Sequence, residues 1–279
     1  MKHLDDIRDD EIRLIEPKGR NRNIFRKWWF WIAVLSCVIV IVLTVMYFCN
    51  NDGVNQTNTP LPVAPNIIED KLACVTICDT TINDVSMRLF TPQNAKPEMC
   101  VGAVDTTDYG IILAFEAADI RADNGQIVGD FVLNGKIMSN GKAKKAFCAI
   151  IDGKTYIDNS EDSPLLEEAI EKQGCFFRQY PLVMNGIIQE NKPKGKAIRS
   201  ALCEKDGIIM VISTVSRESF YDFAQALADF GVNQAIYLKG SNSFGFCRTV
   251  DSTFSWGECT MCDEYAESVN FILWKSINK

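Results

Sequence analysis

The longest apolar run of the chain predicts a membrane-spanning helix. Residues 28–48 read WWFWIAVLSCVIVIVLTVMYF and carry no charge over 21 positions. At about 1.5 Å per residue, a helix of this length spans roughly 30 Å, the thickness of the hydrocarbon core of a bilayer. Trp residues at one end and Tyr47 at the other are typical of the two membrane interfaces. We therefore expect a single helical span.

The charges that flank this run predict its orientation. The segment 18–27 carries five Lys and Arg residues and no acid, whereas the first Lys or Arg on the other side is Lys71. The positive-inside rule then places the N-terminus in the cytoplasm and the main domain outside it, in a periplasm or the extracellular space. A cleaved signal peptide is the rival interpretation, but its apolar region is about 7–15 residues long and ends at small residues. Here the run ends at Tyr47 and Phe48, which favours an uncleaved anchor.

The rest of the chain divides by composition. Residues 1–27 form a cytoplasmic tail, and residues 49–66 are rich in Asn and Pro without periodicity, which is typical of a flexible linker. Residues 67–279 are long enough for one domain with one core. We expect this domain to be extracytoplasmic.

The apolar positions of the domain form short β-branched or aromatic runs joined by Asn-Gly or Asp-Gly. Four such segments are VLNGKI at 132–137, IIDGKTYI at 150–157, VMNGII at 183–188 and EKDGIIMVI at 204–212. These dipeptides accept the positive φ angles of type I′ turns, so each marks a hairpin. The pattern predicts an α+β fold with a mainly antiparallel sheet and a few packed helices.

Two segments have helical signals instead. The first begins with Ser163 as N-cap and Pro164 at the first helical position, and is expected to end near Gly174. The second is expected over 217–230, with Ser216 as N-cap and Gly231 at its C-terminal cap. A strand at 234–238 and a small polar loop at 239–243 follow it.

Composition excludes several classes of function. The chain has 279 residues, 29 Lys and Arg against 36 Asp and Glu, and a net charge of −7. It has no Lys/Arg-rich block beyond residue 27, so we expect no nucleic-acid partner. The single histidine is His3, which excludes His-based catalytic units and His-ligated metals from the rest of the chain. We predict no metal and no cofactor.

The chain has eleven cysteines, nine of them in residues 67–279. Pairing is the default expectation outside the cytoplasm, although an odd number leaves at least one thiol unpaired. Cys259 and Cys262 form a C-x-x-C that is compatible with redox chemistry or with half of a zinc site, for which Cys74 and Cys78 are the conceivable partners. Cys148, Cys175 and Cys203 lie in apolar, strand-like runs, where ordinary buried thiols are common.

Two carboxylates near a strand end suggest a hydrolytic site. Glu116 and Asp119 end an apolar run, and glycoside hydrolysis usually needs two carboxylates that flank the scissile bond. Three arginines supply cations able to hold a phosphoryl group, namely Arg121, Arg178 and Arg199. The alternative is that the carboxylates are solvated or form a salt bridge with a nearby Arg. Gly240, Ser241 and Ser243 are likewise either backbone donors to an anion or only a tight polar turn.

The stretch from Ala114 to Ser243 resembles the phosphodiester glycosidase family, which includes an enzyme that removes α-N-acetylglucosamine from a phosphodiester on lysosomal glycoproteins. Three blocks carry this resemblance. The blocks, in the order found in the family, are Ile111–Ile120 followed by Gly125 and the hairpin at Asn134-Gly135, then Phe176–Gly186 with Ile198–Leu202, then the helix 217–230 with Ala235–Ser243. The third block and the ending Asn270–Trp274 are also similar to a branch found in Bacteroides-type gut bacteria. The resemblance implies a hydrolase for a sugar linked through a phosphodiester, in glycan or exopolysaccharide metabolism.

The chain departs from the family pattern at positions of chemical interest. Glu116 stands where the family has Asn, Asp119 and Ile120 stand where it has paired aromatics, and Lys239 stands where it has Asp. Arg199 and Gly240 match the family. An ammonium in place of a carboxylate inverts the local charge, so the role of that Asp does not transfer to this chain. The resemblance therefore leaves open a second function, that of a non-catalytic glycan-binding or envelope scaffold protein. A redox or thiol protein that uses Cys259 and Cys262 is a third.

Overall fold

The structure is a computed structural model that describes residues 72–241, 243–258, 265 and 267–277. The chain divides into two compact units, residues 1–59 and 60–279, and the described residues belong to the second. The predicted span at 28–48 and the linker at 49–66 lie outside the described residues. Within the part of the chain that is described, no helix has the length and apolar character needed to cross a bilayer.

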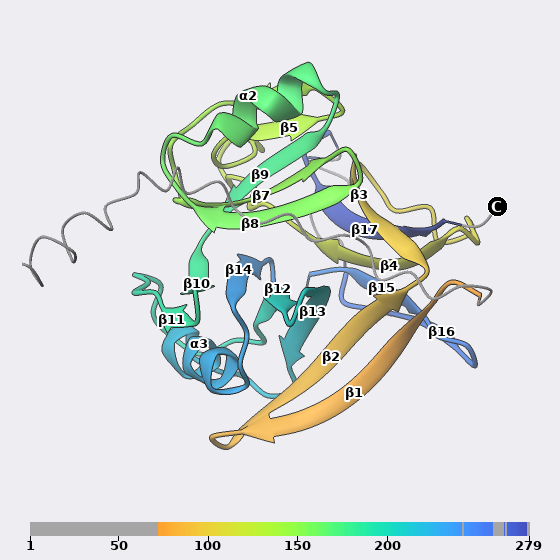
Figure 1. Cartoon of the computed structure of the whole chain (residues 1–279), viewed down its shortest axis with the longest axis vertical. Helices are drawn as coiled ribbons and strands as arrows, with labels where there is room; N and C mark the ends of the chain where they lie inside the picture. Colours follow the sequence, from red (N-terminus) through yellow and green to blue (C-terminus); the bar gives the residue numbers. More distant parts are fainter. Residues whose placement is uncertain (1–71, 242, 259–264, 266, 278–279) are drawn as a thin grey trace, which may run out of the picture. The chain divides into compact units, whose positions relative to one another are not determined.

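The largest sheet has seven strands, all paired antiparallel, in the order β1-β2-β13-β12-β14-β10-β11 (Figure 1). Helix α3 (Phe220–Asp229) packs on one face of this sheet. The opposite face contributes to the main core. The strand bounds are β1 Cys74–Ile82, β2 Val85–Gln93, β13 Ile208–Thr214, β12 Ser200–Lys205, β14 Gln234–Leu238, β10 Pro181–Met184 and β11 Ile187–Ile188.

Two five-stranded antiparallel sheets complete the domain. The second sheet, in the order β16-β15-β4-β17-β3, contains β16 Thr253–Trp256, β15 Gly245–Arg248, β4 Ile111–Glu116, β17 Asn270–Ser276 and β3 Ala95–Val101. The third, in the order β6-β5-β9-β7-β8, contains β6 Lys136–Ser139, β5 Phe131–Leu133, β9 Cys175–Gln179, β7 Ala146–Ile151 and β8 Lys154–Asn159. Helix α2 (Pro164–Glu171) covers the face of the third sheet that points away from the main core (Figure 1).

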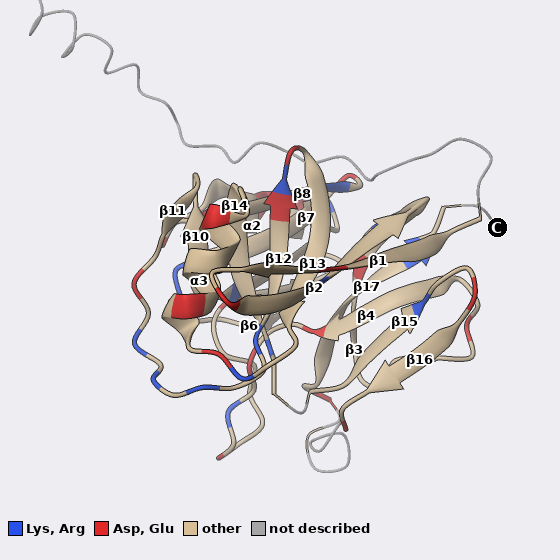
Figure 2. Cartoon of the chain, turned by 90° about the horizontal axis from the view of Figure 1, so that it is seen from below, with Lys and Arg blue, Asp and Glu red and all other residues tan. Residues whose placement is uncertain are grey.

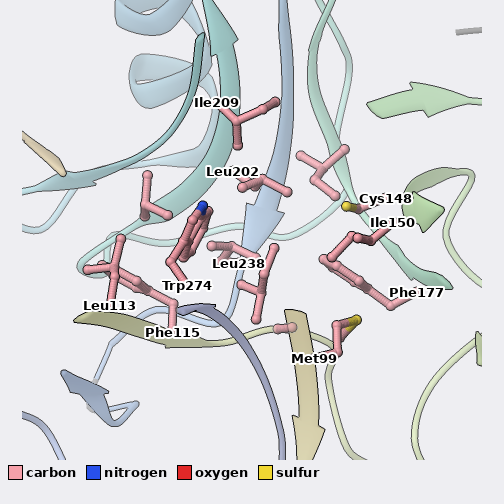
Figure 3. Close-up of a cluster of buried hydrophobic side chains, with 14 of the residues drawn as sticks. Met99, Leu113, Phe115, Cys148, Ile150, Phe177, Leu202, Ile209, Leu238 and Trp274 are labelled. Atoms are coloured by element: carbon pink, nitrogen blue, oxygen red, sulfur yellow. The ribbon is translucent and has the colours of Figure 1, made fainter. Parts of the chain in front are cut away.

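The main core lies where one face of each sheet meets the others. Figure 3 shows Leu202 and Leu238 of the first sheet close to Trp274 and Phe115 of the second, with Phe177 of the third nearby. Charged residues lie mainly in the loops and at strand ends (Figure 2). The predicted class, a mainly antiparallel α+β fold with packed helices, is confirmed.

All four predicted hairpins are present. Each Asn-Gly or Asp-Gly joins two antiparallel neighbours, and both residues of each turn have positive φ, for example 49° at Asn134 and 77° at Gly135. A fifth turn of this kind, Asn83-Asp84, joins β1 to β2. Asn and Asp adopt the left-handed region more readily than other non-glycine residues, so this hairpin also had a local signal.

The helices follow their caps, with one correction. Ser163 caps α2 as predicted, and its side chain accepts from Leu165 N. Helix α3 begins at Phe220 with Ser219 as N-cap, and not at 217 with Ser216. The reason is that Glu218 pairs with Ala197 in an isolated β-bridge, which holds the preceding residues extended. Gly231, with φ of 86°, follows the C-cap Phe230.

Candidate functional site

A pocket of about 480 Å³ lies beside the loop that follows β14. The middle of β2, the start of β12 and the end of β13 line it, and β16 contributes two aromatic side chains. Of the eight residues named from the sequence as site candidates, three line this pocket: Gly240, Ser241 and Ser243. The other described lining residues are Arg88, Phe90, Ile198, Ser200, Ser213, Thr214, Val215, Phe254, Trp256 and Gly257.

The loop at Gly240 is tightly packed against the backbone. A Cβ added to Gly240 would lie far inside van der Waals contact with the carbonyl oxygen of Ile198, so only glycine fits. The N–H groups of this loop bond within the protein: Gly240 N donates to the Tyr237 hydroxyl over 3.2 Å, and Ser241 N to Ile198 O over 2.9 Å. The geometry therefore favours a tight polar turn over a set of backbone donors aimed at an anion.

Glu116, at the end of β4, is paired with Lys239. Its side chain is 3% exposed and its Oε2 accepts from Lys239 Nζ, while its Oε1 accepts from Phe244 N over 2.8 Å. The Lys239 side chain is 28% exposed. Two of the residues that differ from the family pattern thus contact each other, and both Glu116 oxygens have partners within the protein.

Asp119 is also paired with a lysine. Its Oδ2 accepts from Lys144 Nζ, which also donates to Gln179 Oε1 over 3.0 Å. The Asp119 side chain is 33% exposed, against 6% for Lys144. The loop between Glu116 and Asp119 is fixed by Asn270, whose side chain bonds both the N–H and the carbonyl of Ala118. Asp119 is therefore the more accessible of the two predicted catalytic carboxylates.

Lys144 is a buried cation that sequence reasoning missed. Burial lowers the pKa of its ammonium, and the charge of Asp119 opposes that shift. Nζ also lies 4.5 Å from the centroid of the Tyr180 ring, and the residue has a positive φ of 66°. Nothing in the local sequence singles it out from its neighbours Lys142 and Lys145.

The three predicted phosphoryl-binding arginines do not line the pocket. Arg178 is buried, and its guanidinium donates to Asp130 and to three backbone carbonyls. Arg199 lies over the Phe220 ring at 4.3 Å and donates to the carbonyls of Gly195 and Glu218. Arg121 is exposed and forms a two-bond pair with Asp123. The structure thus does not gather these arginines around one ligand.

The seven cysteines that the structure describes are free thiols, so the expected pairing is not found among them. Cys148, Cys175 and Cys203 are buried, as predicted, and burial raises the pKa of each thiol. Such thiols are poor nucleophiles. Cys259 and Cys262 lie outside the described residues. Among the described ones, no group of three or more His, Cys, Asp or Glu side chains is placed to hold a metal ion.

Comparison with solved structures relates the fold to one characterised domain. The catalytic domain of zebrafish N-acetylglucosamine-1-phosphodiester alpha-N-acetylglucosaminidase, auto-inhibited by its pro-peptide, matches with a TM-score of 0.54 and 14% identity over 78% of this chain and 88% of that one. A hypothetical protein from Synechocystis matches with a TM-score of 0.49 and 12% identity over 74% of this chain and 64% of that one. No curated protein matches the chain.

The sequence comparison identifies the family. The model of the phosphodiester glycosidase family matches residues 109–258, which is more than half of the chain. That segment contains β4 and the loop after β14, and therefore both lysine–carboxylate pairs and most of the pocket. The chain belongs to the phosphodiester glycosidase family.

Proposed function

We propose that this protein takes a sugar linked through a phosphodiester into the pocket beside Gly240 and hydrolyses that linkage. The proposal rests on the location of the pocket within the segment that matches the family. The pocket is built largely from the family segment, and its wall includes the loop residues Gly240, Ser241 and Ser243. Its volume of about 480 Å³ lies in the range of small-molecule sites.

The lining of the pocket suits a sugar. The Trp256 ring is supported by Phe90, with ring centroids 5.4 Å apart, and by Phe115 at 5.1 Å. The ring is fixed against Gly245, where an added Cβ would overlap it. A rigid, partly exposed indole offers an apolar surface to a sugar ring, and hydroxyl groups of the pocket provide polar contacts, among them Ser200 and Ser213.

We assign acid or base chemistry to Asp119, which does not line the pocket, so the linkage of a substrate bound there would have to extend from the pocket to Asp119. One of its oxygens is not used by Lys144, and a third of its side chain is exposed. Glu116, by contrast, uses both oxygens inside the protein. We assign Glu116 to holding the loop after β14 through Lys239 and Phe244.

A second candidate, a non-catalytic member that binds glycans, is favoured by the Glu116–Lys239 pair. None of the described residues that line the pocket is an acid, and glycoside hydrolysis usually needs two. Lys239 places a cation where the family has an Asp, and this cation pairs with Glu116. In this second candidate function, the protein binds the same class of ligand but does not hydrolyse it.

We also propose the topology read from the sequence: a single span at 28–48, a cytoplasmic N-terminus and an extracytoplasmic domain. A reporter enzyme that is active only outside the cytoplasm, fused after residue 279, is expected to be active. A reporter that is active only in the cytoplasm is expected to be inactive at the same position, and the reverse result would refute this topology.

The two candidate functions are separated by one experiment. The full-length chain in detergent is incubated with an α-N-acetylglucosaminyl phosphodiester and with an aryl glycoside, and binding is measured by calorimetry. Asp119→Asn should abolish turnover, while Asp123→Asn, in an exposed Arg–Asp pair, should leave it unchanged. Binding without turnover would support the second candidate. A folded chain with neither binding nor turnover would refute both.

A further inference from the structure

A row of polar side chains crosses four neighbouring strands of the seven-stranded sheet. Asp79 on β1 is the register partner of Arg88 on β2, Arg88 is the partner of Ser213 on β13, and Ser213 is the partner of Ser200 on β12. Register partners in antiparallel strands point to the same face of a sheet. The four strands lie side by side in the sheet (Figure 1), so the four side chains form a continuous polar row.

This row borders the apolar core and forms part of the pocket. The neighbouring row on the same face lies two residues away on β2, β13 and β12. It consists of apolar side chains of the main core, namely Phe90, Val211 and Leu202. Arg88, Ser213 and Ser200 line the pocket. The polar row therefore marks where the sheet passes from core to ligand-accessible surface.

Arg88 is held in a fixed orientation. Its Nε donates to Asp79 Oδ1 over 2.7 Å and its NH2 group to Oδ2 over 2.8 Å, and the Arg88 side chain is 44% exposed. The hydrogen bond from Arg88 lowers the pKa of Asp79, which keeps the pair ionised. A guanidinium has five N–H donors, so this pair leaves donors available to a ligand. Among the described residues that line the pocket, Arg88 is the only charged one.

Two hydroxyl groups stand next to Arg88 in the row. Ser200 Oγ and Ser213 Oγ are 2.7 Å apart, so one hydroxyl donates to the other and the second hydroxyl hydrogen is free to donate to a ligand. A planar cation beside a hydroxyl donor suits an anionic phosphoryl oxygen. The strands of the polar row provide these donors, whereas β16 contributes the aromatic rings of Phe254 and Trp256 to the lining of the pocket.

We infer that Arg88, together with Ser213 and Ser200, forms the phosphoryl subsite of the pocket and orients a phosphate-linked sugar with its sugar toward Trp256. Arg88 lies outside the family segment 109–258, so the β1–β2 hairpin supplies the cation of this subsite, whereas Ser200 and Ser213 come from the family segment. The inference rests on the proposed function for the sugar half of the ligand. The inference that a phosphoryl group binds here rests only on the polar row of side chains.

The test compares two arginines in equivalent pairs. Arg121 also bonds one aspartate through Nε and NH2, at 2.9 and 2.6 Å, and is similarly exposed, but it does not line the pocket. Arg88→Gln and Arg121→Gln are made in the full-length chain. Dissociation constants are measured by calorimetry for inorganic phosphate, N-acetylglucosamine and an α-N-acetylglucosaminyl phosphodiester, at low and at moderate salt. Unfolding midpoints verify that both variants fold.

Arg88→Gln is expected to weaken binding of phosphate and of the phosphodiester by about tenfold or more and to leave neutral sugar unaffected, with Arg121→Gln close to wild type. Arg88→Lys, which keeps the charge without the planar fork, is expected to fall between wild type and Arg88→Gln. Unchanged phosphodiester binding in a folded Arg88→Gln variant would overturn the inference and leave the proposed function standing. Arg88-dependent binding of phosphate without binding of either sugar probe would support the subsite and refute the proposed function. Absence of binding to all three probes would overturn both.

Discussion

The buried pair of Glu116 and Lys239 allows a quantitative test of how the loop after β14 is held. The carboxylate is 3% exposed and the lysine side chain 28% exposed. Lys239→Met keeps most of the aliphatic stem but leaves Glu116 with Phe244 N as its remaining partner. Removing one partner of a buried ion pair costs about 3–5 kcal/mol, and partial solvent access at Lys239 places the expected loss near 3 kcal/mol.

Glu116→Gln should cost less, about 1 kcal/mol, since its amide oxygen still accepts from Phe244 N and Lys239 reaches solvent. The double variant should then be more stable than Lys239→Met alone by about 2 kcal/mol, because the uncompensated buried charge is gone. This coupling is what a double-mutant cycle measures. The measurement is urea unfolding of the full-length chain in detergent, followed by Trp fluorescence.

The exposed pair of Lys142 and Asp162 provides the matched control. Its side chains are 73% and 84% exposed, and such pairs contribute about 0–1 kcal/mol. The cycle Lys142→Met with Asp162→Asn should therefore show coupling below about 0.5 kcal/mol. Additive effects at Glu116 and Lys239, or a loss below about 1 kcal/mol for Lys239→Met, would refute the buried-pair reasoning.

Three further predictions follow from packing and from burial. Gly240→Ala should destabilise the domain by about 2 kcal/mol and abolish ligand binding, because the added Cβ overlaps Ile198 O. The control is Gly141→Ala, whose Cβ would be 3.5 Å from its nearest neighbour. It should cost less than about 1 kcal/mol in the same urea unfolding. Burial lowers the pKa of Lys144 in the folded protein from 10.5, so the unfolded state binds this proton more tightly. The free energy of unfolding of wild type should therefore rise relative to that of Lys144→Met as pH rises toward 10.5. Unfolding at about pH 7 and about pH 10 measures this difference, and a fall would contradict the prediction. In native protein, iodoacetamide should alkylate the exposed Cys78 and leave buried Cys148 and Cys203 unreacted until urea is added, as peptide mass spectrometry would detect.

Membership of the family leaves the reaction to be decided by a few side chains. The fold retains a pocket and the tight approach at Gly240, whereas both predicted catalytic carboxylates carry a lysine partner. Each lysine comes from a different segment, Lys144 from the loop before β7 and Lys239 from the loop after β14. Fold similarity at 14% identity cannot choose between catalysis and binding, because function depends on the site and not on the fold.

The sequence alone determined the local structure. Some signals act on the backbone within a few residues and can therefore be predicted from the sequence. These are the Asn-Gly and Asp-Gly turns, the N-cap Ser163 and the glycine Gly231 after α3. The start of α3 was placed wrongly because the competing bridge to Ala197 is a long-range contact. The membrane span at 28–48 is a local pattern of the same kind and stays a prediction.

The tertiary structure alone decided which charges meet. Glu116 and Lys239 are 123 positions apart, and Lys144 and Asp119 are 25 positions apart. Arg88 enters the pocket because β2 pairs with β13, far along the sequence. Charge partners depend on strand order and burial, and neither is encoded in the local pattern around any one residue. For that reason the sequence could predict candidate carboxylates and arginines. Only the packing of the sheets determined which of them pair within the protein and which face a ligand.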